Sequence, residues 1–252
     1  FKQKTAYEIM PSLVGSEMCI RDRFISTSDD AIISVCDQLN WRDGQGIVHC
    51  SGAASVDVLN SGVEQGAIAG AFHPLQAFNS VENGVLSIPG TTFGIEGNIE
   101  MRTYLSTMAK DIGGIPIFLR PQDKVLYHVS GVMMGNLLAV LASVAASMWD
   151  KFDHTREEGV RALTPMIPAA AANLNSVGIP QAVAGPYPRG DIGTVRKHLA
   201  AMNAQAPEYL PVYVELALAG LPFAVEKGSL LKERAAEIKD LLESYKPPGI
   251  TD

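Results

Sequence analysis

The chain has little cysteine and no excess of basic charge. Its three cysteines form no C-x-x-C pair, and no cysteine–histidine cluster has the spacing of a zinc site. This usage suits a reducing cytoplasm, and we expect no bound metal. The net charge is −7 over 252 residues, so the chain lacks the basic surface that nucleic-acid binding requires. The composition therefore favours a cytoplasmic protein whose partner is a small molecule.

Regular hydrophobic periodicity is missing from the first two dozen residues. Residues 2–23 follow neither a helical nor a strand period, and Glu8, Pro11 and Glu17 interrupt every run that could serve as a secretory signal. When back-translated, "KQKTAYEI" and "SLVGSEMCIRDR" resemble the two ends of a common sequencing-library adapter. We therefore expect residues 1–23 to be an adapter-derived artefact joined in frame to a truncated gene. The alternative is a natural, divergent N-terminal arm that precedes Phe24.

Charge is absent from one long apolar run. Residues 129–149, "VSGVMMGNLLAVLASVAASMW", contain no formally charged side chain over 21 residues, about the length that spans a bilayer. Ser130, Asn136, Ser143 and Ser147 interrupt the run, and no second span follows it. We expect a helix that is buried on all sides against a partner subunit, and no membrane insertion.

The chain changes character near residue 121. Before that point, short apolar runs alternate with helical segments, as in α/β units. The expected strands are "FISTS", "GIVHCSG", "AIAGAFHP", "TTFGIEG" and "IPIFL", with helices over 29–39, 55–65 and 99–112. The later helices are expected over 123–149, 156–177 and 229–245, the last with Leu230, Leu231, Ala235, Ile238, Leu241 and Leu242 on one face. The sequence predicts an α/β domain at 24–121 and an all-α domain at 122–252.

Four motifs carry a resemblance to a known family: "HCSGA" at 49–53, "AFHPLQAF" at 71–78, "KVLYH" from 124 with Asn136, and "GPYPRGDIGTVRKHL" at 185–199. Together they resemble a family in which a Rossmann-like domain precedes a helical domain, the domain of unknown function 2520. The likeness covers residues 24 to about 220. It implies an N-terminally truncated Rossmann-like parallel sheet, a helical dimerisation and substrate domain, and NADP or NAD as cofactor. The same architecture is similar to that of pyrroline-carboxylate and ketopantoate reductases.

The sequence contains no G-x-G-x-x-G turn, the usual grip for a dinucleotide pyrophosphate. If the adapter interpretation is right, that turn was lost with the upstream strands, and the chain as given binds dinucleotide poorly. The remaining cofactor contacts would lie where the surviving strands end. We expect them at Thr27, Ser28 and Asp29 after the first strand and at Ser51 and Gly52 after the second. The alternative is a helix cap at Asp29 and an ordinary turn at Ser51 and Gly52.

Four further residues are candidates for catalysis. His73 follows a strand in "FHP", and a near-neutral pKa would suit it to proton transfer. Lys124 and His128 are four residues apart and share a helix face, and Asn136 lies two turns further on. Either Lys124 or His128 would act as proton donor, with Asn136 orienting the substrate. The alternatives are a solvated lysine, capping or core histidines and a packing asparagine.

A second cluster, Arg189 and Asp191, precedes a helix near the end of the family motif. We expect both to contact the substrate, because Arg189 has the geometry to bind a carboxylate with two hydrogen bonds. The alternative is that Asp191 caps the helix and pairs with Arg189. The favoured function is an NAD(P)-dependent oxidoreductase acting on a small polar carbonyl, imine or hydroxy compound, as a homodimer through the helical domain. The alternatives are a non-catalytic dinucleotide-binding or sensing protein, and a non-redox enzyme or assembly protein.

Overall fold

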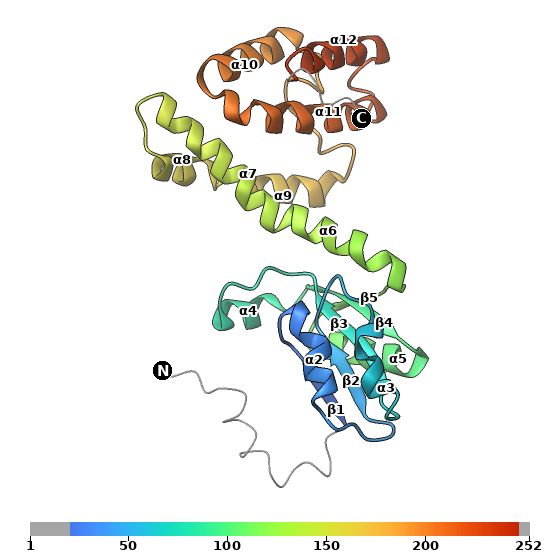
Figure 1. The fold of residues 1–252 in the computed structure, drawn as a ribbon. Helices are drawn as coiled ribbons and strands as arrows, with labels where there is room; N and C mark the ends of the chain where they lie inside the picture. Colours follow the sequence, from blue (N-terminus) through green and yellow to red (C-terminus); the bar gives the residue numbers. More distant parts are fainter. Residues whose placement is uncertain (1–20, 247–252) are drawn as a thin grey trace. The chain divides into compact units, whose positions relative to one another are not determined.

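A computed structural model describes residues 21–246 of the chain, and they form two compact units. The first unit extends to Leu138 and contains a five-stranded sheet with its helices, whereas the second begins at Ala139 and is helical (Figure 1). This confirms the expected combination of an α/β and an all-α part. Most of the expected adapter segment lies outside the described residues, but Asp22 and Arg23 belong to the first strand. The artefact and the boundary at residue 121 stay predictions.

The sheet has the strand order β1-β2-β3-β4-β5. The strands are β1 (Asp22–Ile25), β2 (Gly46–His49), β3 (Ile68–Pro74), β4 (Thr92–Gly97) and β5 (Ile115–Phe118). All neighbours are parallel except β3 and β4, which are antiparallel, so the sheet is mostly parallel, as the expected Rossmann-like parallel sheet requires. The chain leaves β3 through α4 (Val81–Ser87) and re-enters the sheet at the end where β3 stopped. The ends of β1, β2 and β3 and the start of β4 therefore lie at the same end of the sheet.

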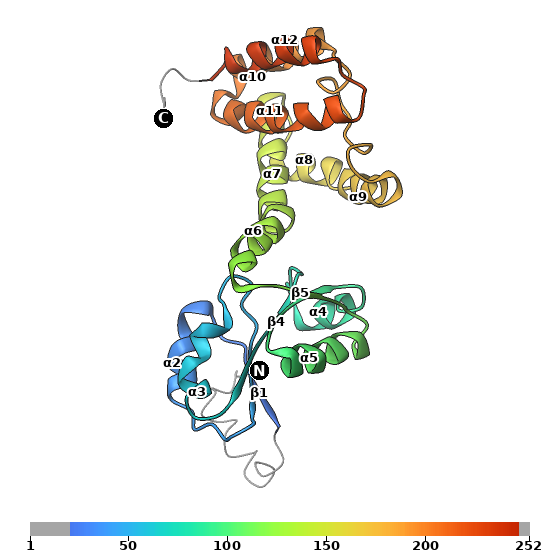
Figure 2. The same cartoon turned by 90° about the vertical axis from the view of Figure 1, so that its right-hand side faces the viewer.

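Helices cover both faces of the sheet, as Figure 2 shows. The 3₁₀ turns η3 (Asp29–Ala31) and η4 (Val56–Leu59) lead into α2 (Ile32–Asp37) and α3 (Asn60–Val63) on one face. On the other face lies α5 (Ile99–Asp111), which Asn98 caps by accepting the Met101 N–H at 2.9 Å. Because Met101, Leu105 and Ala109 recur every four residues, α5 presents one apolar stripe to the sheet.

Two helices predicted to be continuous are each divided in two. The stretch expected over 123–149 consists of the turn η5 (Pro121–Asp123), α6 (Lys124–Met134) and α7 (Asn136–Ser147), with a break at Gly135. After η6 (Met148–Lys151), the stretch expected over 156–177 divides into α8 (Arg156–Leu163) and α9 (Met166–Val177). Pro165 precedes α9 and lacks the N–H that would continue the hydrogen-bond ladder of α8.

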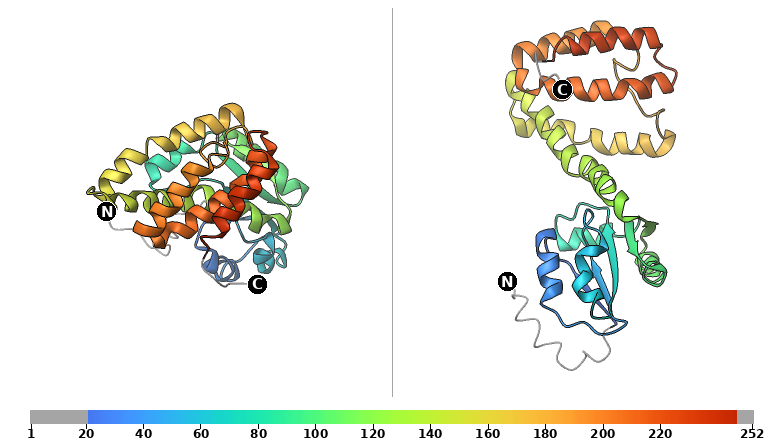
Figure 3. Two further views of the ribbon diagram at one scale, coloured as in Figure 1. Left: turned by 90° about the horizontal axis from the view of Figure 1, so that it is seen from above. Right: turned by 45° about the vertical axis from the view of Figure 1, so that its right-hand side comes forward.

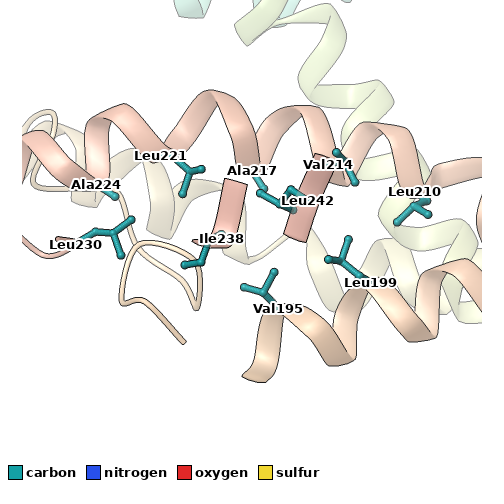
Figure 4. Close-up of a cluster of buried hydrophobic side chains, with 10 residues drawn as sticks. All are labelled: Val195, Leu199, Leu210, Val214, Ala217, Leu221, Ala224, Leu230, Ile238 and Leu242. Carbon is teal, nitrogen blue, oxygen red and sulfur yellow. The ribbon is translucent and has the colours of Figure 1, made fainter. Parts of the chain in front are cut away.

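The second unit is organised around α10 (Ile192–Gln205), η7 (Pro207–Tyr209), α11 (Leu210–Glu226) and α12 (Lys232–Glu243), of which α10, α11 and α12 pack side by side (Figure 3). Figure 4 shows their buried side chains converging between the helices. Leu230, Ile238 and Leu242 belong to this core as predicted. Leu231 does not, because it precedes the first turn of α12 in an extended conformation and is 75% exposed.

The long apolar stretch is not buried within the chain, so the expectation of burial on all sides is wrong for a single subunit. Of its most apolar window in Pro121–Lys151, 6% is buried, and Leu137 and Val140 on α7 are exposed. The expectation that no second span follows is wrong, because both this stretch and Pro207–Glu226 are long and apolar enough to cross a bilayer. That is weak evidence, because core helices of soluble proteins have the same length and composition. A covering partner subunit stays a prediction.

We expect Leu199→Ala to lower the free energy of unfolding by about 2–5 kcal/mol, because it opens a cavity in the α10–α11–α12 core. Leu231→Ala is the control, since the same truncation at an exposed site changes stability by about 0.5 kcal/mol or less. Urea unfolding of the full chain, followed by far-ultraviolet circular dichroism, measures both. Equal losses would contradict this assignment of the core.

Candidate functional site

The loop after β2 is fixed by a hydrogen-bond network around Ser51. The Ser51 hydroxyl donates to Asp29 Oδ2 at 2.7 Å and accepts the N–H groups of Ala53 and Ala54 at 3.2 and 3.0 Å. Asp29 makes no side-chain cap on the turn it begins, so the expected helix cap is wrong and its carboxylate binds this loop instead. The turn interpretation of Ser51 is therefore confirmed, while a cofactor contact at Ser51 or Asp29 stays a prediction.

His49, the last residue of β2, is buried beneath this loop. Its Nδ1 accepts the Ser51 N–H at 3.1 Å, so the proton of the neutral ring lies on Nε2, which faces the Ser55 carbonyl at 3.2 Å. Burial, and then the charge of Lys124, lowers the pKa of His49 to about 4. His49 is therefore a neutral residue that fixes the position of the loop.

Gly52 lies where two histidines meet. A Cβ atom on Gly52 would be 2.7 Å from both His73 Nε2 and His128 Cδ2, closer than side chains can approach. The two imidazole rings are 5.9 Å apart, centroid to centroid, at 77°. His73 comes from the end of β3 and His128 from the second turn of α6. Only a glycine in this loop leaves room for both rings.

Tyr127, which sequence reasoning missed, completes this cluster. Its hydroxyl lies 3.0 Å from His73 Nδ1, and its ring meets the His73 ring edge-on at 5.5 Å. Burial raises the pKa of Tyr127 to about 12, so the phenol keeps its proton at neutral pH. Burial, with the nearby His128 and Lys124, lowers the pKa of His73 to about 4. The expected near-neutral pKa of His73 is not observed.

His73, His128 and Asn136 line one pocket of about 430 Å³. Its other lining residues are Leu75, Gln76, Ala77, Ser130, Gly131, Val132, Met134 and Gly135. A Cβ on Gly131 would lie 2.6 Å from Leu75 Cδ1, so a larger residue there would push the Leu75 side chain aside. Three of the four residues expected to act in catalysis thus meet in one cavity, although their catalytic roles stay predictions.

Lys124, the fourth, does not line that pocket. Its side chain is 2% exposed, and its Nζ lies 3.3 Å from Oε2 of Glu96, whose side chain is 3% exposed. Burial lowers the pKa of Lys124, while the charges of Glu96 and Asp29 act against that shift. Glu96 also accepts the Val56 N–H through Oε1 at 3.3 Å. Sequence reasoning missed Glu96, although a carboxylate inside the apolar strand "TTFGIEG" signals a buried partner.

The expected cofactor residues fit only part of a dinucleotide. Thr27 and Ser28 are exposed after β1, and the Thr27 hydroxyl donates only to the neighbouring Ser28 carbonyl, so both can approach a ribose or nicotinamide. Gly52 cannot cradle a phosphate, because the two imidazole rings fill the space beside it. Among residues 21–246, no strand leads through a glycine-rich turn into a helix that could hold the pyrophosphate.

Arg189 and Asp191 belong to the second unit. Asp191 caps α10 by accepting the Thr194 N–H at 3.0 Å, and hydrogen bonds to Thr194, aided by the Arg189 charge, lower the pKa of its carboxyl. The capping interpretation of Asp191 is confirmed. Arg189 is exposed, and its contact with substrate stays a prediction. Within the described residues, no three His, Cys, Asp or Glu side chains gather in a way that could hold a metal ion.

We expect Glu96→Gln to destabilise the protein by about 3–5 kcal/mol near neutral pH, because it leaves the Lys124 ammonium buried without its counter-charge. The folded state then binds fewer protons than the unfolded one. The loss therefore shrinks as pH rises toward the ordinary lysine pKa of about 10.4. Denaturant unfolding of the full chain as a function of pH tests this. The double variant Glu96→Gln/Lys124→Met should lose less, and an unchanged single variant would contradict a buried pair.

Comparison with solved structures identifies the fold. TM1727 from Thermotoga maritima is 22% identical with a TM-score of 0.64, and the alignment covers 80% of this chain and 78% of that one. BF3122 from Bacteroides fragilis, provisionally named an NADP oxidoreductase, is 20% identical at a TM-score of 0.62, covering 79% and 74%. Pyrroline carboxylate reductase from Plasmodium falciparum, with NADP bound, is 13% identical at a TM-score of 0.51, covering 86% and 76%. At these identities the likeness shows the fold alone.

A search of curated proteins found no significant match. The family model described as "Domain of unknown function (DUF2520)" matches residues 91–219, which is more than half of the chain. This segment begins just before β4 and ends within α11, so it includes Tyr127, His128 and Asn136. The chain belongs to the DUF2520 family.

Proposed function

We propose that the protein is an NAD(P)-dependent oxidoreductase that acts on a small polar carbonyl, imine or hydroxy compound. The observation that carries this proposal is the pocket in which His73, His128 and Asn136 meet, beside the edge where β1, β2 and β3 end. Open α/β sheets bind their ligands at that edge. The reductase-type fold supports the same conclusion, and the cofactor, when bound, supplies or accepts the hydride.

The residues of this chain handle the substrate and a proton. In the reducing direction, His128 gives the proton of a ring nitrogen to the substrate oxygen or nitrogen and becomes neutral. Asn136 orients the same group through its side-chain amide. His73 stays uncharged, because its pKa is about 4, and contributes hydrogen bonding without transferring a proton. Lys124 is held by Glu96, so it acts on the pocket only through its charge.

The pocket favours an uncharged substrate. Its lining combines histidine, glutamine, serine and asparagine with apolar side chains, and it includes no lysine, arginine, aspartate or glutamate. A carboxylate in this cavity would lose its hydration and would meet no opposite charge except that of the proton that His128 carries. Arg189, which belongs to the second unit, stays the predicted contact for a substrate carboxylate.

The first test is NADPH oxidation with a panel of neutral and carboxylate-bearing carbonyls and imines. Where the source locus encodes native residues upstream of Phe24, the extended protein is used. We expect His128→Gln to lower kcat about 10²–10⁴-fold, the usual contribution of a positioned acid. His154→Gln, at an exposed histidine of the second unit, is the matched control. An unchanged rate in His128→Gln removes the catalytic assignment, and NADPH binding without turnover favours the sensing alternative.

The second part of the proposal is a homodimer formed through the helical domain. The exposed apolar side chains of α7, among them Leu137, Val140 and Leu141, support it. Soluble monomers seldom expose a continuous apolar surface of this kind, which usually marks an interface.

We expect Val140→Lys to convert a dimer into a monomer, because it places an ammonium group within an apolar interface. Val63→Lys is the control, since Val63 is a similarly exposed valine on α3, a helix that packs against the sheet. Light scattering coupled to size-exclusion chromatography gives the mass. A wild-type monomer contradicts the homodimer, and recovery only in detergent indicates a membrane contact.

A further inference from the structure

We propose that Tyr127 is a positioning residue that sets the tautomer of His73. The Tyr127 hydroxyl donates to His73 Nδ1, so the neutral imidazole carries its proton on Nε2 and presents an N–H donor at the pocket. The catalytic role of this tautomer rests on the proposed function. The tautomer itself can be measured without any activity.

The contact between Tyr127 and His73 has one favoured direction. The hydroxyl oxygen lies 3.0 Å from His73 Nδ1, and the other acceptor in reach, the His73 carbonyl, is 3.4 Å away. The shorter contact lies at an ordinary hydrogen-bond distance, whereas 3.4 Å is long for an O–H donor. Because the buried phenol stays protonated, it has a hydrogen to donate, and Nδ1 accepts it.

Two glycines build the geometry around this hydrogen bond. A Cβ atom on Gly94, the residue paired with His73 across β3 and β4, would lie 2.9 Å from the Tyr127 hydroxyl. A Cβ atom on Gly52 would lie 2.7 Å from His73 Nε2 on the opposite side of the ring. Because Gly94 and Gly52 have no side chains, there is space on both sides of the His73 imidazole. Tyr127 occupies the Nδ1 side, and the Nε2 side faces Gly52 and His128.

His73 Nε2 makes no hydrogen bond to any residue between 21 and 246. His73 is half-buried and lines the pocket, so a ligand there can accept a hydrogen bond from this N–H. The donor would polarise the carbonyl or imine of the substrate while His128 supplies the proton. A neutral histidine suits that role, because it donates a hydrogen bond and remains uncharged throughout.

His49 provides an internal reference for the measurement. Its Nδ1 accepts a backbone N–H, which can only donate, so its Nε2–H tautomer is fixed by the covalent structure of the main chain. His49 and His73 are both neutral at pH 7, because burial lowers the pKa of each to about 4. The two residues should therefore give the same pattern of ring nitrogen signals.

The experiment is a long-range ¹H–¹⁵N correlation spectrum of the full chain with ¹⁵N-labelled histidine at pH 7, with His73→Gln and His49→Gln used for assignment. We expect His73 to show the Nε2–H pattern of His49. In Tyr127→Phe, which removes only the hydroxyl, we expect the ratio of the Nε2–H to the Nδ1–H form to fall about tenfold. That factor corresponds to a hydrogen bond worth about 1.4 kcal/mol.

A predominant Nδ1–H form in the wild type would overturn the inference, and so would an unchanged ratio in Tyr127→Phe. If Tyr127→Phe perturbs the fold, the His49 signals shift as well, and the wild-type spectrum alone then decides between the two tautomers of His73. Absence of NADPH oxidation would contradict the proposed function and leave the tautomer assignment intact, so the two failures are distinguishable.

Discussion

The buried ion pair between Glu96 and Lys124 is the constraint on which the arrangement of the site depends. A carboxylate within β4 can be buried only if a cation meets it, and the first residue of α6 supplies that cation. Once Lys124 is fixed there, the helical repeat places Tyr127 and His128 over the next part of the sheet. Those residues then reach Gly94, His73 and Gly52. The pair thus sets the position and rotation of α6 relative to the strands.

At the carboxyl ends of β1, β2 and β3, glycines leave space and histidines supply the polar groups. Gly52 and Gly94 remove side-chain volume where the rings of His73, His128 and Tyr127 must lie. His49 and His73 are both neutral for the same physical reason, which is burial near the positive charge of Lys124. They nevertheless have different partners. His49 has hydrogen bonds at both ring nitrogens, whereas His73 has one nitrogen turned toward Gly52 and His128.

The sequence alone predicted the five strands, the change to helices near residue 121, and the three residues that line the pocket. Those predictions succeeded because they rested on local period and on strand ends, which the backbone determines directly. Glu96 and Tyr127 were missed because their roles depend on contacts between residues 28 and 54 positions apart in the chain. The antiparallel pair β3–β4 was missed for a similar reason, since the path of the chain from β3 through α4 to β4 is a tertiary property. Asn136 was found, but the break at Gly135 was not.

The charges nearest the pocket have partners within the protein. Lys124 is paired with Glu96, and Asp29 accepts from Ser51, so the hydrogen-bond donors and acceptors that a ligand meets in the cavity come from His73, His128 and Asn136. Hydrogen-bond dipoles that are fixed in advance stabilise charge as it develops on a carbonyl or imine, and they bind the uncharged ground state less strongly. A free lysine in the same place would attract anions whether or not they react. The buried ion pair therefore fixes α6 against β4 and also keeps the Lys124 ammonium group out of the pocket lining.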